Sequence, residues 1–153
     1  MNKTSMISIF LRSLTIQLSF NFRTMQGLGF AFSMLPLKLR KDFIAKHLRM
    51  FNTNPYLAPA IIGSVVNIEE KGDGAGKAND IKSALMGPYS AIGDSFFWGA
   101  LRLFSSALAV LVALYGSILA PLTFMLIFSP AQLLVRINGF IKGYHLGMDG
   151  FNY

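Results

Sequence analysis

The most informative polar side chain in this sequence is Asp94, whose carboxylate interrupts the apolar stretch of residues 81–101. A carboxylate is costly in an apolar segment, and inside a membrane it usually marks the path of a substrate or an ion. The alternative is an N-cap, in which Gly93-Asp94-Ser95 begins a helix and the carboxylate accepts hydrogen bonds from backbone amides. Both roles are compatible, because discontinuous membrane helices place their polar ends at transport sites.

Four amide side chains form a second set of candidate substrate-binding or partner-facing residues: Asn21, Gln26, Asn52 and Asn54. Each amide offers a hydrogen-bond donor and an acceptor together. The alternative is structural, with the amides capping helices and satisfying backbone groups in broken segments. The sequence leaves both interpretations open at each of these residues.

Other kinds of chemistry find little support in the sequence. Cysteine is absent, which excludes a disulfide framework, a thiolate metal site and a cysteine nucleophile. His47 and His145 lack a carboxylate at a ligand spacing, so we expect no metal site, and we expect His47 in solvent beside its basic neighbours. No pair of titratable groups lies at a defined spacing from a nucleophile. We therefore expect neither an enzyme active site nor a bound cofactor.

The elements that position these residues are predicted to be membrane helices. Between Arg102 and Arg136 the chain carries no formal charge, and uncharged runs of about 18 residues or more usually span a bilayer. A single helix over this run would reach about 50 Å, whereas the hydrocarbon core is about 30 Å thick. We predict a spanning helix at residues 103–114, extended or bent through residues 116–121, and a second apolar segment at residues 122–135. The expected breaking points are Gly116, Pro121 and Pro130.

Composition favours the same class of protein. Hydrophobic residues make up 53% of the chain and charged residues 14%, against about 25% charged residues in an ordinary soluble domain. The alternative is a very apolar soluble oligomer. We predict an all-α membrane protein with amphipathic and re-entrant or broken helices plus one or two transmembrane helices.

The N-terminal region has three expected segments. Apolar residues at spacings of three and four predict an amphipathic helix over residues 7–22, either in the membrane interface or packed on a partner's helices. Residues 25–36 are too short to span and read as a broken or re-entrant segment, in which Gly27 and Gly29 allow close backbone approach. Residues 38–51 are expected to form a basic helix.

The remaining segments complete the predicted order. Residues 52–55 are expected to cap or turn the next element, and residues 56–68 form a short apolar segment. Residues 69–80 read as a polar, glycine-rich loop that divides residues 1–68 from residues 81–153. Two interruptions, Gly87-Pro88 and Gly93-Asp94, suggest that residues 81–101 form two half-helices that meet within the membrane.

Positive charge is concentrated near the start of the chain, whose net charge is +7. A cluster accounts for much of the excess: Lys38, Arg40, Lys41, Lys46 and Arg49. Basic loops that flank apolar segments stay cytoplasmic and attract anionic lipid headgroups. We therefore expect this cluster to face the inner surface of a lipid bilayer, with no nucleic acid as partner.

Three blocks and a closing element carry a family resemblance. The blocks are RSLTIQLSFNFRTMQGLGFAFSMLP (residues 12–36), HLRMFNTNPYLAPAIIGSVVNIEE (residues 47–70) and IKSALMGPYSAIGDSFFWGALR (residues 81–102), and the closing element is GYHLG (residues 143–147). In this order they resemble the IID membrane subunit of the mannose/fructose/sorbose family of bacterial sugar phosphotransferase system (PTS) permeases. The chain is much shorter than usual for the family, so we expect the family's C-terminal half to be absent.

The resemblance assigns positions to the family's motifs. They fall on the four amides, on Asp94, on Met25 and Thr53, and on a set of residues to which we assign a structural role: Gly27, Gly29, Pro55, Gly87, Pro88 and Gly93. Asn54 and Phe22 stand where His and Tyr are expected in many relatives, which removes two polar groups.

The resemblance implies a bacterial inner-membrane, multi-pass subunit that pairs with a IIC membrane subunit. Together they carry a mannose-, fructose- or sorbose-type sugar, or an amino sugar, inward while cytoplasmic IIA and IIB subunits supply the phosphoryl group. A IID subunit carries no phosphorylated residue in that scheme. The amides and Asp94 then bind sugar hydroxyls or the partner subunit. The alternative is a truncated, non-transporting assembly or receptor protein that binds IIC.

Overall fold

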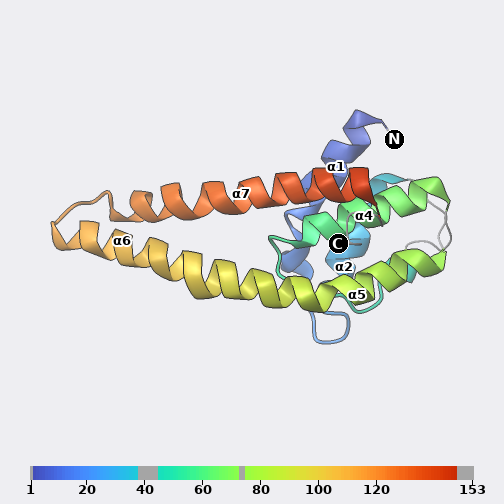
Figure 1. The fold of residues 1–153 in the computed structure, drawn as a ribbon, viewed down its shortest axis with the longest axis horizontal. Coiled ribbons are helices and arrows are strands. Elements are labelled where there is room, and N and C mark those ends of the chain that lie inside the picture. The colour runs from blue at the N-terminus through green and yellow to red at the C-terminus, as the bar shows by residue number, and fades with distance from the viewer. Residues whose placement is uncertain (1, 38–44, 73–74, 148–153) are drawn as a thin grey trace.

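The computed structural model describes residues 2–37, 45–72 and 75–147, and the regular elements in these ranges are helices (Figure 1). The α-helices are α1 (Lys3–Ser13), α2 (Gly27–Met34), α4 (Ala58–Lys71), α5 (Ala75–Gly93), α6 (Arg102–Leu114) and α7 (Ala120–Leu146). There are also two 3₁₀ helices and one π-helix, which are η1 (Ile16–Ser19), η2 (Leu35–Leu37) and η3 (Asp94–Leu101), and residues 45–47 are helical.

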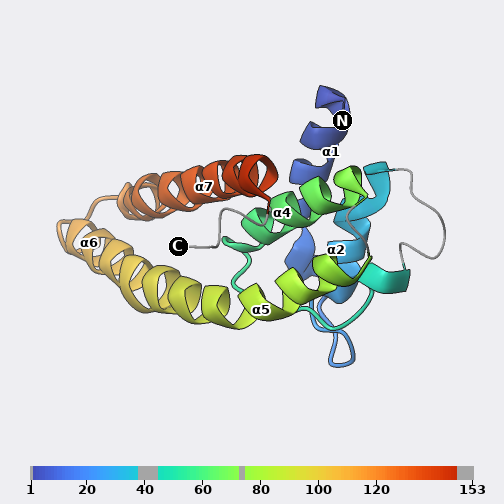
Figure 2. The ribbon, with the colours of Figure 1, turned by 45° about the vertical axis from the view of Figure 1, so that its right-hand side comes forward.

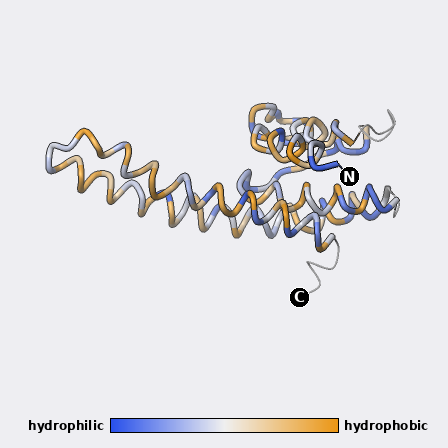
Figure 3. The backbone as a smooth tube through the Cα atoms, turned by 90° about the horizontal axis from the view of Figure 1, so that it is seen from above, coloured by the Kyte–Doolittle hydropathy of each residue, from blue (hydrophilic) through white to orange (hydrophobic). Residues whose placement is uncertain are grey.

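A long helical hairpin dominates the shape of the molecule (Figure 1). One arm runs without interruption over Gly76–Leu114 and the other is α7, and both are long and apolar enough to cross a membrane. In each arm only 11% of the most apolar window is buried inside the molecule, so most of these side chains face outward. Apolar residues cover the hairpin arms, whereas hydrophilic residues gather at the end where α4 meets α5 (Figure 3).

The turn of the hairpin lies where the uncharged run was predicted to break. Gly116 has φ 71°, a left-handed conformation that glycine adopts at little cost. Pro121 lies in the first turn of α7. Backbone N–H groups in a first turn make no hydrogen bond within the helix, so the N–H that proline lacks is not needed there. The break predicted at Pro130 is wrong, because α7 continues through this residue. Membrane helices tolerate proline where neighbouring groups satisfy the freed backbone carbonyl.

The two half-helices predicted for residues 81–101 are also wrong. α5 continues through Pro88 and passes at Gly93 into η3, whose wider turns lead directly into α6. A π-helical segment accommodates irregularity without breaking the helix, and such segments occur frequently at functional sites. Asp94 is therefore not an N-cap, since Gly93 before it is itself helical (φ −65°, ψ −43°). The helical arm formed by α5, η3 and α6 remains continuous as it curves (Figure 2).

The predicted amphipathic helix of residues 7–22 begins earlier and ends sooner, because α1 stops at Ser13. Two hydroxyl groups bond to backbone carbonyls there: Ser13 Oγ donates to the Phe10 oxygen at 2.5 Å and Thr15 Oγ1 donates to the Arg12 oxygen at 2.8 Å. The segment that follows is the short η1.

The loop predicted at residues 69–80 is mostly helical. α4 continues to Lys71, Gly72 ends it with φ 71°, and α5 begins at Ala75. The division into residues 1–68 and 81–153 stays a prediction. Of the basic helix predicted at residues 38–51, residues 38–44 lie outside the described ranges, and residues 45–47 are helical.

Close packing of α4 against α7 joins the N-terminal part of the chain to the hairpin. A Cβ atom on Gly143 would collide with the Ala60 carbonyl oxygen, and one on Gly63 would collide with the Phe140 oxygen. Ser64 Oγ donates to the Gly143 oxygen at 3.2 Å, and Asn67 Nδ2 donates to the Tyr144 oxygen at 2.7 Å. Small residues allow membrane helices to approach closely, and interhelical hydrogen bonds reinforce the contact.

His47 is buried at 1% exposure, so its expected position in solvent is wrong. Its ring stacks on Phe30 with the centroids 5.6 Å apart, and its Nε2 lies 3.4 Å from Glu69 Oε1. That distance by itself favours a charged pair. Burial outweighs it and lowers the pKa of His47 to about 3, with Lys82 and Lys46 opposing a further positive charge. Burial likewise raises the pKa of Glu69. His47 is thus neutral at pH 7.

Acidification should therefore destabilise the protein through His47. The unfolded chain binds a proton near pH 6.5, whereas the folded chain does so only near pH 3, so stability falls as pH drops through this window. From pH 8 to pH 5 the loss is about 2 kcal/mol. Thermal unfolding of the purified protein in detergent at each pH measures it. The raised pKa of Glu69 has the opposite effect on the pH dependence of stability. The parent protein is therefore compared with His47→Gln, which should lack the loss of stability that His47 causes at low pH. An equal pH dependence in both proteins contradicts the assignment.

Candidate functional site

The structure brings two predicted site residues together at the side of the hairpin. Asn54 Nδ2 donates to Asp94 Oδ1 at 2.8 Å, and Ser90 Oγ donates to Asp94 Oδ2 at 3.1 Å. Asn54 is 1% exposed, whereas Asp94 is exposed. A Cβ atom on Gly93 would overlap the Asn54 side chain, so glycine at this position permits the contact. The amide thereby orients a carboxylate that remains accessible.

The turn at residues 52–55 positions the Asn54 amide. Asn54 Oδ1 accepts a hydrogen bond from the Tyr56 N–H at 3.0 Å, and its backbone oxygen accepts from the amides of Leu57 and Ala58, both at 3.0 Å. An asparagine side chain that bonds the backbone two residues later is typical of such turns. The segment predicted to cap or turn the next element therefore turns the chain into α4, and it leaves Nδ2 directed at Asp94.

The same turn also contacts the second arm of the hairpin. The guanidinium carbon of Arg136 on α7 lies 4.8 Å from the ring centroid of Tyr56, and Tyr56 packs against Phe97 and Phe128 at centroid distances of 4.7 and 5.9 Å. Arg136 Nε is buried and has no hydrogen-bond partner among the described residues. A carboxylate and a guanidinium are thus held on either side of one turn, with an aromatic ring beside the guanidinium.

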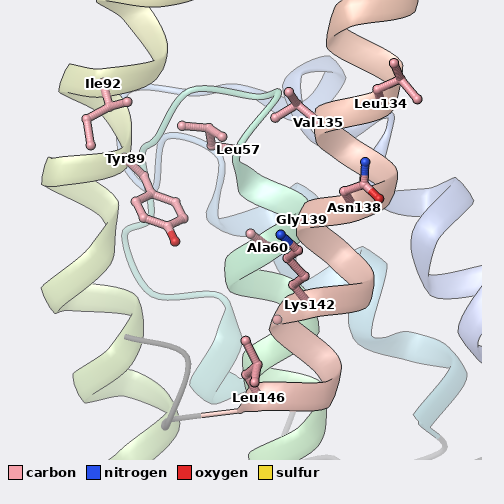
Figure 4. A pocket seen from close by; sticks show the side chains of 11 residues that line it. Leu57, Ala60, Tyr89, Ile92, Leu134, Val135, Asn138, Gly139, Lys142 and Leu146 are labelled. Carbon is pink, nitrogen blue, oxygen red and sulfur yellow. The ribbon is translucent and has the colours of Figure 1, made fainter. Parts of the chain in front are cut away.

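A cavity of about 470 Å³ lies next to this turn, between α5 and α7 (Figure 4). Leu57 and Ile92, the neighbours of Tyr56 and Gly93, belong to its lining. Tyr89 from α5 and Lys142 from α7 extend into the space between the helices (Figure 4). Its volume is within the range of small-molecule sites, which are mainly apolar with a few polar groups.

Two of the predicted amides hold the backbone instead. Asn21 Oδ1 accepts from the amides of Arg23 and Thr24 at 3.0 and 2.9 Å. Gln26 is 2% exposed, and its Nε2 donates to the Thr53 oxygen and to Gln17 Oε1, both at 2.8 Å, while its Oε1 accepts from the Thr53 N–H at 3.1 Å. These contacts match the structural interpretation of the two residues.

The other predicted residues do not take part in the Asn54–Asp94 contact. Asn52 is exposed on the turn, Gly87 and Pro88 are exposed on α5, and Pro55 lies within the turn. Cβ atoms on Gly27 and Gly29 would collide with backbone of Arg49 and Ile16, which shows the expected close approach. Among the described residues, no group of three His, Asp or Glu side chains is placed to hold a metal ion.

Sequence reasoning missed three residues of this region. Ser90 bonds to Asp94, and Arg136 lies against the ring of Tyr56. One signal for Arg136 was available. It is the cation that ends the uncharged run, and α7 continues beyond it. An ionisable residue within a membrane helix is a functional candidate in its own right.

Comparison with known proteins agrees with the sequence blocks. The chain matches the model of the PTS system mannose/fructose/sorbose family IID component over residues 1–152. It is 41% identical over 155 residues to the mannose-specific EIID component of Escherichia coli K12, covering 92% of this chain and 55% of that protein. The sorbose-specific EIID component of Klebsiella pneumoniae is 38% identical over 157 residues, covering 94% and 57% respectively. The chain thus spans about half the length of the curated relatives it matches.

Solved structures show the same fold. A chain in the cryo-EM structure of the mannose transporter ManYZ in complex with microcin E492 matches with a TM-score of 0.92 and 38% identity, covering 97% of this chain and 60% of that chain. A second structure, of a membrane protein, matches with a TM-score of 0.86 and 39% identity, covering 94% of this chain and 58% of that chain. The predicted all-helical membrane class is confirmed.

Proposed function

Because this chain belongs to the mannose/fructose/sorbose family of PTS IID components, we propose that it lines part of a sugar translocation path together with a IIC membrane subunit. The observation that carries the proposal is the contact between Asn54 and Asp94 beside the Arg136–Tyr56 pair. Polar and charged groups within an apolar hairpin are costly, and they mark transport paths in membrane proteins.

The chemistry of these groups suits a sugar. The exposed carboxylate of Asp94 accepts hydrogen bonds from hydroxyl groups, and the half-buried guanidinium group of Arg136 donates them. The ring of Tyr56 offers an apolar face beside them. Ligand sites of this kind combine a mainly apolar lining with a few placed polar groups. The substrate class is a mannose-, fructose- or sorbose-type sugar, or an amino sugar, whose ammonium group pairs with Asp94.

A partner subunit supplies the rest of the path. Large apolar side chains on both hairpin arms are exposed, among them Phe104 at 57% and Leu126 at 65%, so part of this surface is available to IIC and part to lipid. Cytoplasmic IIA and IIB subunits carry out the phosphoryl transfer, and this chain carries no phosphorylated residue.

The charge distribution supports an orientation in a bacterial inner membrane. The end where α4 meets α5 carries Lys71 and Lys77, and the tip of the hairpin carries apolar or uncharged residues. Basic residues near membrane segments remain cytoplasmic. The α4–α5 end therefore faces the cytoplasm, and the two arms cross the bilayer as a multi-pass unit.

Sugar uptake in cells that lack the native IID subunit tests the proposal, with this chain and its IIC, IIA and IIB partners produced together. Asp94→Asn keeps an oxygen for Asn54 and removes the charge, so uptake of labelled mannose should fall about tenfold or more at equal membrane abundance, because hydrogen bonds to a charged group contribute about 1.5–3 kcal/mol.

The matched control is Asp80→Asn, which removes an exposed carboxylate from the same helix and should leave uptake unchanged. Equal uptake by the Asp94→Asn variant and the parent chain contradicts the site assignment. The same measurement with fructose, sorbose and an amino sugar ranks the substrate classes.

A second candidate function is that of an assembly or receptor protein that binds IIC without moving sugar. One observation favours it: the matching ManYZ transporter was solved bound to microcin E492. Co-purification with IIC without sugar-dependent uptake supports this function, whereas restored uptake rejects it.

A further inference from the structure

A narrow apolar cleft lies on the outer side of the molecule, between α1 and α7. Its volume is about 320 Å³. Apolar side chains from both helices line it, together with one lysine: Met6, Ile7, Phe10, Ile137, Ile141 and Lys3. Phe10 holds the two helices together through the ring of Phe140, with the centroids 5.5 Å apart. Among the described residues that line the cleft, Lys3 is the one with a charged side chain.

The surface of α1 beside the cleft is also apolar. Ile7 is 60% exposed and Leu11 is 55% exposed, and they lie one and two turns after Lys3 on the same stripe of the helix. Residues 2–37 contain Lys3, Arg12 and Arg23 and no carboxylate. This is the composition of a helix that rests at a membrane interface, with apolar side chains toward the acyl chains and cations near anionic headgroups.

The cleft lies at a suitable depth. At about 1.5 Å per residue, α7 extends about 32 Å from Ala120 at the hairpin turn to Ile141 in the cleft, which is close to the thickness of the hydrocarbon core, about 30 Å. With the hairpin turn at one interface, the cleft therefore lies at the other, where acyl chains meet headgroups. A lysine at this level attracts the phosphate of an anionic lipid.

The charge and the depth of the cleft indicate its occupant. Its lining is apolar except for Lys3, and it lies at the level where acyl chains meet phosphate headgroups. We propose that the cleft binds one acyl chain of an anionic phospholipid, whose phosphate pairs with Lys3, and that this lipid fastens α1 to α7.

Native mass spectrometry of the full chain in detergent tests the site, with dioleoyl-phosphatidylglycerol and dioleoyl-phosphatidylcholine as probes. We expect a single tightly bound phosphatidylglycerol and weaker phosphatidylcholine. Lys3→Gln should weaken phosphatidylglycerol binding about fivefold, the effect of one lysine near a charged lipid surface, and leave phosphatidylcholine unchanged. The exposed lysine at the end of α4 provides the charge-matched control, Lys71→Gln, which should bind both lipids like the parent.

Filling the cleft provides an independent test. Ile137→Trp places a large ring in the cleft and should abolish the bound lipid, whereas Leu133→Trp, about one turn earlier on α7 and outside the lining, should not. Circular dichroism establishes whether each variant is folded. If Ile137→Trp does not fold, the test depends on Lys3→Gln, which changes an exposed side chain.

Two results overturn the proposal. One is equal binding of the two lipids that Lys3→Gln does not change. The other is that Ile137→Trp still binds lipid but no longer co-purifies with IIC. That result would assign the cleft to the partner subunit. The sugar-uptake assay plays no part in either result, so the lipid site and the proposed transport function stand or fall separately.

Discussion

Replacing Gly143 by leucine should separate α4 from α7 and lower the free energy of unfolding by at least about 3 kcal/mol. A Cβ atom there would collide with the Ala60 carbonyl oxygen and lie 3.0 Å from Ser64 Oγ. The first of these neighbours is backbone in the first turn of the packed helix α4, so it cannot rotate away as a side chain could. The substitution also forces apart the Ser64 hydrogen bond to the Gly143 oxygen.

Thermal unfolding in detergent, followed by circular dichroism, measures the effect as a fall in Tm of roughly 6–12 °C. The matched control is Gly87→Leu on α5, where a Cβ atom meets nothing within 4 Å and leucine favours the helix more than glycine does. Equal Tm values for the two variants would show that the close approach of α4 and α7 does not hold the fold together.

Replacing Gln26 by methionine should also destabilise the protein severely, by about 4 kcal/mol. Methionine has a similar length but cannot bond the Thr53 backbone, so a buried N–H and a buried carbonyl oxygen lose their partner. Each unsatisfied buried group costs about 1–3 kcal/mol. The turn before Asn54 would then lose its attachment to α2.

Urea unfolding in detergent gives the stability of Gln26→Met, with Asn52→Ala as the control because Asn52 is an exposed amide on the same turn. If Gln26 instead contacts substrate or a partner, the variant keeps its unfolding midpoint and loses only sugar uptake or IIC binding. That outcome would contradict the structural role assigned to it.

The sequence by itself determined the membrane class and the two apolar segments of the uncharged run. Both follow from composition along the chain: an uncharged run too long for one span, with Gly116 near its middle, predicts two apolar segments with a bend or break between them. The thickness of the bilayer fixes the length of such segments, so no knowledge of packing is needed. Family membership was likewise carried by local blocks of sequence.

Helix ends and continuity were harder to predict, because they depend on competing local interactions of similar strength. α1 ends at Ser13, well before the apolar periodicity ends. Conversely, Pro88 and Gly93 do not break the long arm, since a π-helical segment absorbs the irregularity.

The candidate site was decided by tertiary structure. Asn54 and Asp94 were each predicted to be polar residues of interest, but their contact joins residues 40 positions apart, and Arg136 reaches Tyr56 from a third element. The burial of His47 was also decided by tertiary structure. Periodicity tells which face of a helix is apolar, but the angle and register at which two helices pack depend on small residues such as Gly143 that let their backbones approach. For this reason the sequence yields the membrane helices and their chemical groups, and only the packed structure shows which of those groups meet.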